Sequence, residues 1–370
     1  MEFIYDENET WTNGSNMTYL SQDFQMPSLP RWGFWTKFLS TPIIVLVGII
    51  GNVLSFIVMK TKTLRHKSYS HYLCALAVFD TMTLVIRQIE SVDEYLVSYK
   101  ESSGIFQNFN DSSCKLYNFT VHVITLMCSW LVVFMAVERL IAVCFPFKKV
   151  YFRKETGAAI AIGVLFVIVC LTQTFRFLMI EHSMYDDENN IQDCLAAQKY
   201  REIYTSLDVY FFLWTLVFVL PVICIIICNS FVLYHILRVR RDLYKEENYL
   251  TYRNGRAREV KHKSTCMLLI VTFMYIITLL PLFTLSLIVD VTIKLGSLER
   301  ARNTYMTLIP YIDLSVSVSL LNYAANFFIY VLSGKRFRFE LQTLFMKKRP
   351  IKRCFTARST RVEFLFRRGS

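Results

Sequence analysis

The stretch Cys114–Lys148, CKLYNFTVHVITLMCSWLVVFMAVERLIAVCFPFK, decides the fold of this chain. It opens with a cysteine, continues through a mostly apolar run and then reaches Glu138-Arg139-Leu140. At about 1.5 Å per helical residue, Cys114 and Arg139 would lie roughly 37 Å apart, farther than the roughly 30 Å hydrocarbon core of a bilayer. One helix can therefore place a cysteine at one membrane face and an arginine at the other.

The rest of the chain repeats this apolar pattern. The composition is 54% hydrophobic with a mean hydropathy of +0.36, too apolar for a soluble multidomain protein of 370 residues. Lipid offers no water to unpaired backbone groups, so each apolar block of spanning length must be a helix. We therefore predict an all-α membrane protein, a seven-transmembrane helix bundle. The expected spans are about 38–60, 72–97, 114–145, 157–180, 207–237, 263–291 and 307–332.

Charge predicts the orientation of the bundle. The net charge is +12, and most lysines and arginines lie after the first, third and fifth spans or in the C-terminal tail. The positive-inside rule makes these segments cytosolic and puts the N-terminus outside. Because the charge borders membrane spans instead of forming a soluble basic domain, nucleic acid is not an expected partner.

Four segments follow from this reading. Residues 1–37 are expected to be an extracellular flexible N-terminus, and residues 38–333 the transmembrane domain. Residues 334–346 have an amphipathic pattern that predicts a short helix on the inner leaflet, in contact with membrane lipid. Residues 347–370 form a basic cytoplasmic tail. Glycosylation sequons on the predicted outer side begin at Asn8, Asn13, Asn16 and Asn110.

The cysteines divide between the two sides of the membrane. Of ten cysteines, only Cys114 and Cys194 fall on the outer, oxidising side, which leaves one possible pairing. That disulfide would join the third span to the loop before the fifth. Cys354 in the tail is a candidate for palmitoylation.

Polar residues inside the spans are the first functional candidates. Asp80 lies at membrane depth in the second span, where an acid is a functional hypothesis by default. Asn52 in the first span either joins helices by hydrogen bonds or belongs to a functional cluster. Arg87 and Glu90 are three residues apart and share a helix face, so they either pair with each other or line a polar cavity. Pro221 and Pro281 are expected to kink or loosen the fifth and sixth spans.

The ordered set of motifs resembles the rhodopsin-like (class A) family of G-protein-coupled receptors over about residues 38–346. The Glu138-Arg139-Leu140 triplet replaces the family's Asp-Arg-Tyr, and Asn326-Phe327-Phe328-Ile329-Tyr330 replaces Asn-Pro-x-x-Tyr. The other matching elements are Gly51-Asn52, Leu76-Ala77 with Asp80, Cys114 with Cys194, Pro221 and Pro281.

The resemblance implies a role for each motif. It implies a plasma-membrane receptor whose partners are a heterotrimeric G protein and arrestin. Arg139 would be held at rest by Glu138 and the inner end of the sixth span, and would turn toward the G protein when an agonist binds. The remaining switch residues would be Tyr275, Pro281, Asn326 and Tyr330. Asp80 with Asn52, Asn322 and Asn326 would form either a sodium site of the inactive state or a packing network. No other cofactor, no other metal site and no catalytic residue is expected.

The sequence also departs from the family pattern. The fourth span lacks the usual tryptophan, and Leu279 stands where the family often has tryptophan before Pro281. Phe327 removes a proline that favours a kink, and Asn229 stands where the fifth span usually has a tyrosine. The switch is therefore expected to pack differently around these positions and around Tyr275.

Several ligand classes are excluded by single positions. Val121 stands where amine receptors place an aspartate, and residues 307–332 contain no lysine for retinal. The run MAVERLIAVCFPFK is similar to invertebrate neuropeptide receptors of the FMRFamide-receptor-like and thyrotropin-releasing-hormone-receptor-like kind. The candidate pocket residues at the outer ends of the spans are Arg87, Glu90, His122 and Arg176.

A short cationic amidated peptide is the expected ligand, because the outer loops are acidic and can complement it. The acidic loop is also consistent with a solvated surface. A lipid, a metabolite or an odorant-like small molecule is an alternative ligand. A transporter or channel is a different class, although the two halves show no self-similarity. No metal-ligand spacing, nucleophile motif or phosphate loop indicates an enzyme.

Overall fold

The computed structural model describes residues 32–100, 104–144, 155–186, 191–245, 252–295 and 298–346. Within them, seven helical segments are long and apolar enough to cross a membrane, which confirms the predicted bundle. The first four are α1 (Trp32–Met59), α2 (Ser68–Lys100), α3 (Asp111–Cys144) and α4 (Glu155–Gln173). The fifth joins α6 (Arg201–Thr205), the π-helix η5 (Ser206–Val219) and α7 (Leu220–Lys245). The sixth is α8 (Tyr252–Leu295), and the seventh is α9 (Leu298–Ala324) followed by α10 (Asn326–Ser333).

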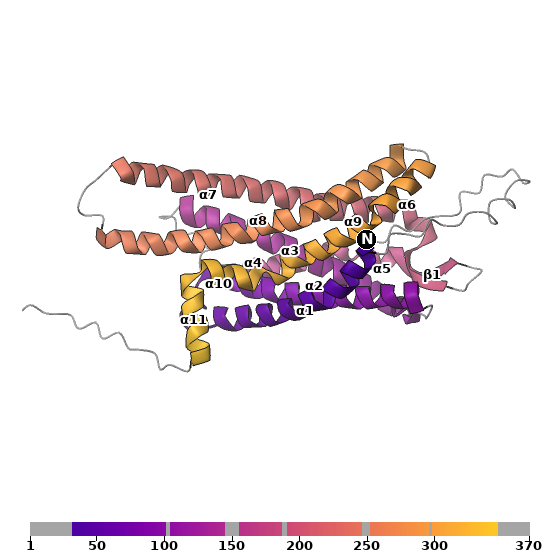
Figure 1. The fold of residues 1–370 in the computed structure, drawn as a ribbon, viewed down its shortest axis with the longest axis horizontal. Helices are drawn as coiled ribbons and strands as arrows, with labels where there is room; N and C mark the ends of the chain where they lie inside the picture. The colour runs from indigo at the N-terminus through magenta and orange to yellow at the C-terminus, as the bar shows by residue number, and fades with distance from the viewer. Residues whose placement is uncertain are drawn as a thin grey trace, which may run out of the picture.

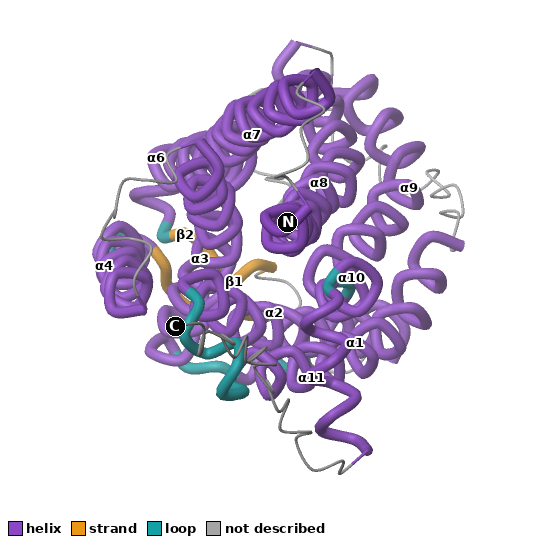
Figure 2. The backbone as a smooth tube through the Cα atoms, turned by 90° about the vertical axis from the view of Figure 1, so that its left-hand side faces the viewer, coloured by secondary structure: helices purple, strands orange, loops and turns teal. Residues whose placement is uncertain are grey.

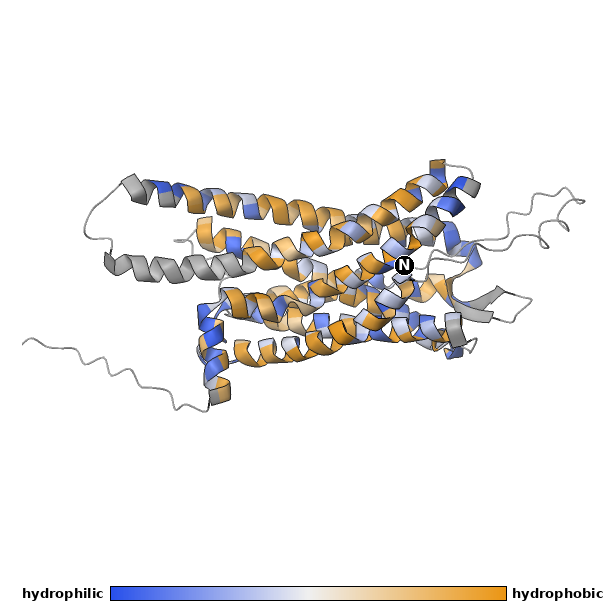
Figure 3. Ribbon diagram, in the orientation of Figure 1, coloured by the Kyte–Doolittle hydropathy of each residue, from blue (hydrophilic) through white to orange (hydrophobic). Residues whose placement is uncertain are grey.

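The spanning helices run side by side along one long axis, as Figure 1 shows. We call the end that carries Cys114 and Cys194 the disulfide end, and the end that carries Glu138 and Arg139 the arginine end. At the arginine end, α11 (Lys335–Met346) turns across the bundle, and α7 and α8 extend beyond the other helices (Figure 1). Apolar residues dominate the middle of the helices, and hydrophilic residues gather toward the ends (Figure 3).

Helix α3 is the central element of the bundle. It contacts α2, α4, α7 and α8, and the view along the helices shows it inside the ring (Figure 2). Its side chains Met127 and Leu131 are completely buried. The outer helices instead expose large apolar side chains such as Ile43, Leu171 and Ile277, the pattern expected where lipid replaces water.

A two-stranded antiparallel hairpin covers part of the disulfide end. Strand β1 (Ile180–Asp186) pairs with β2 (Ile191–Ala196), and His182 lies opposite Cys194. A disulfide joins Cys194 to Cys114 at the start of α3, which confirms the predicted pairing. The short α5 (Arg176–Met179) leads into this hairpin, and the 3-10 helices η2 (Phe106–Asn108) and η4 (Gln198–Tyr200) lie in the neighbouring connections. The two strands were not predicted from the sequence.

Several span boundaries differ from the prediction, and the first span is an example. Helix α1 begins at Trp32, six residues before the expected first span, so the last part of the predicted flexible segment is helical. Side-chain contacts explain the early start. Lys37, near the beginning of α1, donates to the carboxylates of Glu94 on α2 and Asp313 on α9. The fourth span, predicted at about 157–180, agrees with the apolar helical segment Thr156–Met179, in which the short α5 follows the end of α4 at Gln173.

The two proline-related expectations have different outcomes. Before Pro221 the fifth span departs from an α-helix, because the π-helix η5 extends up to Val219, which agrees with the expected loosening of this span. In the seventh span, Phe327 replaces the proline that would favour a kink. The helix is nevertheless interrupted at Ala325, between α9 and α10. The amides of Asn52 and Asn326 donate to the carbonyls of Tyr323 and Asn322, in the turn before the interruption.

Close helix packing explains why two glycines stand where they do. A Cβ atom on Gly33 would lie 2.4 Å from the Cα of Pro310, so α1 and α9 are in backbone contact near the disulfide end. A Cβ atom on Gly51 would lie 2.9 Å from the Cβ of Phe327. The bulky side chain that replaces the family's proline is therefore accommodated by the absence of a side chain on α1.

Candidate functional site

At the arginine end, Glu138 and Arg139 form a buried ion pair with 2.9 Å between Oε2 and Nε. Ser68 of α2 donates to the other carboxylate oxygen at 2.7 Å. The Arg139 guanidinium lies 4.8 Å from the ring centroid of Tyr69, within cation–π range. The predicted contact with the inner end of the sixth span falls on residues 252–268, whose side chains lie outside those that the structure describes. Helix α2 therefore supplies the partners that are seen.

The middle of the bundle holds the predicted polar cluster. The Asn326 amide donates to the Asp80 carboxylate at 2.7 Å, and both side chains are buried. Asn52 donates to the Tyr323 carbonyl at 3.1 Å, and Asn322 contributes its own carbonyl as an acceptor for Asn326. The structure thus joins Asp80 directly to Asn326, while Asn52 and Asn322 meet the same turn through backbone atoms.

The same cluster offers oxygen donors to a cation. Asp80 supplies one carboxylate, and Asn52 Oδ1 is buried without a hydrogen-bond partner among the described residues. These two oxygen donors suit a hard cation. No group of three or more His, Cys, Asp or Glu side chains placed to hold a metal ion occurs in the described part of the chain.

Three switch residues predicted from the sequence lie in the sixth and seventh spans. Tyr275 is almost fully buried in α8 and donates its hydroxyl to the Val217 carbonyl of η5. Pro281 lies within α8, which the structure shows as continuous through it. Tyr330 is buried in α10, and its ring centroid lies 5.6 Å from that of Phe337 in α11. Tyr330 therefore connects the seventh span to the amphipathic helix.

The candidate pocket residues at the disulfide end form two separate groups. Arg87 and Glu90 pair at 2.6 Å, and Tyr117 of α3 donates to Glu90 at 3.0 Å. Both members of the pair remain about one-third exposed, so the predicted pairing is present and part of each side chain stays accessible.

Arg176 belongs to the second group and is completely buried. It donates to Gln173 at 2.9 Å and to the Tyr204 hydroxyl at 2.5 Å, and it forms an ion pair with Asp208. His122 lies 3.4 Å from the same aspartate. The Arg176 guanidinium therefore has all its observed partners inside the protein. Through them, this side chain connects the end of the fourth span to the start of the fifth.

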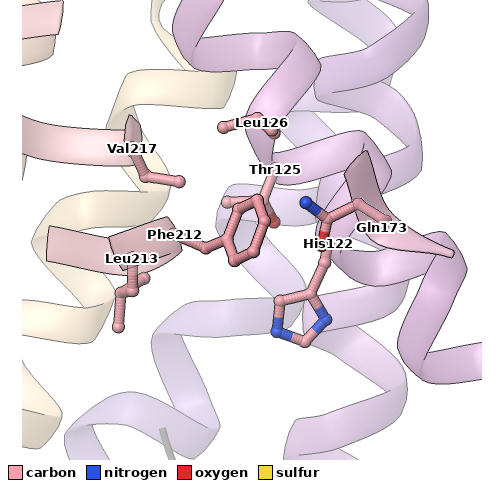
Figure 4. Close-up of a pocket in the computed structure, with 7 residues that line it drawn as sticks. All are labelled: His122, Thr125, Leu126, Gln173, Phe212, Leu213 and Val217. Atoms are coloured by element: carbon pink, nitrogen blue, oxygen red, sulfur yellow. The ribbon is translucent and has the colours of Figure 1, made fainter. Parts of the chain in front are cut away.

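A small cavity lies beside this second group. Its volume is about 20 Å³, enough for about one water molecule and far below the roughly 300–1,000 Å³ of pockets for drug-sized ligands. Figure 4 shows the Phe212 ring in the middle, with Val217 and Leu213 on one side and His122 and Gln173 on the other. Thr125 and Leu126 complete the lining.

A third polar group was not singled out from the sequence. Lys37 of α1 bonds to Glu94 of α2 at 2.8 Å and to Asp313 of α9 at 2.6 Å. Asp208 was also missed, although it ends up beside Arg176. Both aspartates lie in otherwise apolar spans, so the rule that intramembrane acids are functional candidates would have found them.

The remaining predicted sites are the candidates for glycosylation and lipidation. Asn110 is exposed, and its Oδ1 accepts from the Ser113 amide at 2.8 Å, which caps the start of α3. The other sequons, at Asn8, Asn13 and Asn16, lie outside the described residues, and so does Cys354.

Comparison with known proteins places this geometry in a family. The family described as 7 transmembrane receptor (rhodopsin family) matches residues 51–330. Growth hormone secretagogue receptor type 1 of Mustela putorius furo is 25% identical over 296 residues, which cover 79% of this chain and 75% of the relative. Neuropeptide FF receptor 2 of Mus musculus is 23% identical over 383 residues, or 97% of this chain and 84% of the relative.

A shorter match is the galanin-like G-protein coupled receptor npr-9 of Caenorhabditis elegans, 28% identical over 131 residues, or 35% of this chain and 28% of the relative. The family match extends across all seven spans and includes the buried Glu138–Arg139 pair, the disulfide and the Asp80 cluster. The chain therefore belongs to the rhodopsin-like (class A) family of G-protein-coupled receptors.

Proposed function

We propose that this protein is a plasma-membrane receptor for an extracellular peptide and that it activates a heterotrimeric G protein. One observation carries the choice of ligand class. The relative aligned over 97% of the chain is named as a neuropeptide FF receptor, and a galanin-like receptor matches part of the chain. The cationic amidated peptide expected from the sequence is the most specific form of this proposal.

The disulfide end faces outward in this proposal. Disulfides form in oxidising compartments, and Cys114 and Cys194 are joined at this end. The connection between α1 and α2 at the opposite end carries Lys62, Arg65 and Lys67, as the positive-inside rule requires of a cytosolic loop. The N-terminus is then extracellular and α11 lies against the inner leaflet.

The disulfide end offers a peptide both charge and hydrogen-bond partners. Glu94 keeps 39% of its side chain exposed beside Lys37, and the Arg87–Glu90 pair is about one-third exposed. These side chains on α2 are accessible from the outside, so a ligand can contact them without a rearrangement of the helices. Arg176 is different, because it is buried and has a full set of internal partners. We therefore assign Arg176 to the support of the pocket and not to direct ligand contact.

Arg139 is the proposed switch on the cytosolic side. In the conformation seen here, the guanidinium pairs with Glu138 and stacks on Tyr69, so it faces the bundle. We take this arrangement as the resting state. A ligand activates the receptor if it binds more tightly to an arrangement in which Arg139 is released toward the G protein.

Sodium at the Asp80 cluster is a further part of the proposal. Asp80 and Asn52 would hold the ion, which would supply a counter-charge to the buried carboxylate. The ion would then favour the conformation in which Asp80 and Asn326 are close together.

The test is a ligand screen with a nucleotide-exchange readout. A neuropeptide library, a lipid and metabolite library and an odorant library are applied to cells that express the chain, with calcium and cyclic AMP measured. We expect an amidated peptide to stimulate nucleotide exchange on a purified G protein. A response to the lipid, metabolite or odorant library alone would reject the peptide, and a ligand-dependent ion current without exchange would reject the receptor mechanism.

A further inference from the structure

The inner face of α2 carries two charged side chains that are still accessible. Asp80 and Thr83 on this face are buried, whereas Val85 on the opposite face is exposed. Arg87 follows Asp80 by seven residues and Glu90 follows Thr83 by seven, which is about two turns of an α-helix. Arg87 and Glu90 therefore continue the buried face of α2, and the accessible third of each side chain belongs to the inside of the bundle.

A contact from α3 supports this placement. The Tyr117 hydroxyl donates to one oxygen of Glu90 at 3.0 Å, and Arg87 donates to the other oxygen at 2.6 Å. The Tyr117 ring packs against Phe106 and Phe109, with 4.7 Å and 5.9 Å between ring centroids. The Glu90 carboxylate is therefore held between a guanidinium on its own helix and a phenol on the next.

The Arg87–Glu90 pair keeps unused hydrogen-bonding capacity of both kinds. A guanidinium has five N–H donors, and an ionised carboxylate has about four acceptor positions. Within the part of the chain that the structure describes, Arg87 donates one hydrogen bond and Glu90 accepts two. Free donors and free acceptors thus lie side by side on side chains that are about one-third exposed.

The balance of charge decides which chemical group fits this pair. An ammonium group has only donors and is repelled by Arg87, whereas a carboxylate has only acceptors and is repelled by Glu90. A primary carboxamide is neutral and has both kinds of group. Its oxygen can accept from Arg87 while its NH₂ donates to Glu90, so neither side chain faces a like charge.

We propose that Arg87 and Glu90 form a carboxamide-binding site that recognises the C-terminal amide of a peptide ligand. The inference rests on the proposed function, because it specifies which end of the peptide enters the bundle. In this assignment Arg87 and Glu90 contact the amide. Tyr117 is a positioning residue, since its hydroxyl occupies one acceptor position of Glu90 and fixes the direction of the others.

The first test compares two probes that differ only in the end group. N-acetylphenylalaninamide and N-acetylphenylalanine are titrated onto the purified wild-type receptor, and binding is followed by ligand-observed NMR. A probe of this size binds with an affinity of about 1 mM at best. We expect the amide to bind at least about tenfold more tightly than the acid, because the acid lacks the N–H donors and brings a second negative charge to Glu90.

Three results of this first test would overturn the proposal. They are equal affinity of the two probes, tighter binding of the acid, and no binding of the amide up to about 10 mM. This comparison uses the wild-type protein alone, so its result does not depend on whether a variant folds.

The second test inverts the preference. In Glu90→Gln the side chain keeps an oxygen that accepts from Tyr117 but loses its charge, so Arg87 becomes an uncompensated cation. The acid probe should then bind at least about threefold more tightly than the amide. A Glu90→Gln receptor that keeps the wild-type preference would refute the site.

Glu94→Gln is the matched control for this inversion. Glu94 lies one turn farther toward the disulfide end of α2 and is also paired with a basic side chain, Lys37, at 2.8 Å. The change removes the same charge from the same helix but leaves Arg87 and Glu90 paired. The preference for the amide should persist, and its loss in Glu94→Gln would show that general charge and not this pair selects the probe.

A third measurement separates this inference from the proposed function. Each member of the neuropeptide library is applied as its C-terminal amide and as its free acid, with nucleotide exchange as the readout. We expect amides to stimulate exchange at concentrations at least about tenfold lower than acids. Equal potency of the two forms refutes the carboxamide site and leaves the receptor function intact. Selective binding of the amide probe in a protein that never stimulates exchange supports the site and refutes the proposed function.

Discussion

Replacing Asp208 by asparagine is the sharpest test of the buried charge at the disulfide end. The change removes the counter-charge of Arg176, which is 0% exposed and bonded to Gln173, Tyr204 and Asp208. Loss of one partner from a buried ion pair costs about 3–5 kcal/mol. That corresponds to a loss of roughly a hundredfold to several thousandfold in the ratio of folded to unfolded protein.

A matched control shows how much of the stability loss comes from the burial of the ion pair and how much from the loss of a charge alone. Asp111 pairs with Lys115 at 2.6 Å, but its side chain is 52% exposed, so Asp111→Asn should cost at most about 1 kcal/mol. Each variant removes one carboxylate that is paired with a basic side chain, Arg176 for Asp208 and Lys115 for Asp111. The assay compares the thermal unfolding of the detergent-solubilised receptors and their delivery to the cell surface. An Asp208→Asn protein as stable as Asp111→Asn would refute the reasoning.

The double variant Arg176→Gln with Asp208→Asn decides between support and ligand contact. It removes both charges and keeps neutral hydrogen-bonding groups, so most of the lost stability should return. If the ligand response returns with the stability, Arg176 supports the pocket. If stability returns and the response does not, Arg176 contacts the ligand, as the sequence alone suggested.

Four other predictions concern the remaining sites. Arg139→Ala should abolish G-protein activation while surface delivery and ligand binding persist, and unchanged exchange would remove Arg139 from the switch. Cys194→Ser should reduce surface delivery or ligand response, both measured on intact cells, and wild-type behaviour would contradict a role for the disulfide. Gly51→Ala should lower the unfolding temperature by an amount equivalent to about 1–3 kcal/mol, because its Cβ would meet Phe327, and adding Phe327→Ala should recover part of the loss. Replacing sodium by choline should raise agonist affinity in radioligand binding, and Asp80→Asn should remove this difference; equal sodium sensitivity in both proteins would exclude the Asp80 site.

Much of the fold was predictable because lipid imposes strict rules on a chain. Seven apolar blocks gave seven spanning helices, and the compartment rule for cysteines gave the correct disulfide. The helix ends were less accurate. At an aqueous boundary, polar contacts such as Lys37 with Glu94 and Asp313 extend a helix beyond its apolar block, and these contacts are unknown until the helices are packed.

The partners of the site residues were harder to predict than the residues themselves. Arg87 and Glu90 share a helix face, so their pairing follows from the sequence. Arg176 pairs with Asp208 across 32 positions of sequence, through a loop whose hairpin was not foreseen. The interruption at Ala325 was not predicted, because the sequence shows no proline there, whereas in the structure Asn52 and Asn326 donate to carbonyls of that turn.

The turn between α10 and α11 determines where the C-terminal tail begins. The Arg338 guanidinium donates to the carbonyls of Val331 and Leu332, both at 2.7 Å, so a cation closes the end of the seventh span. Helix α11 is twelve residues long and runs at a steep angle to the spanning helices (Figure 1). Its end at Met346 therefore lies about 18 Å to the side of its start at Lys335. Met346, the last residue that the structure describes, therefore lies at the periphery of the bundle and away from its central helix α3.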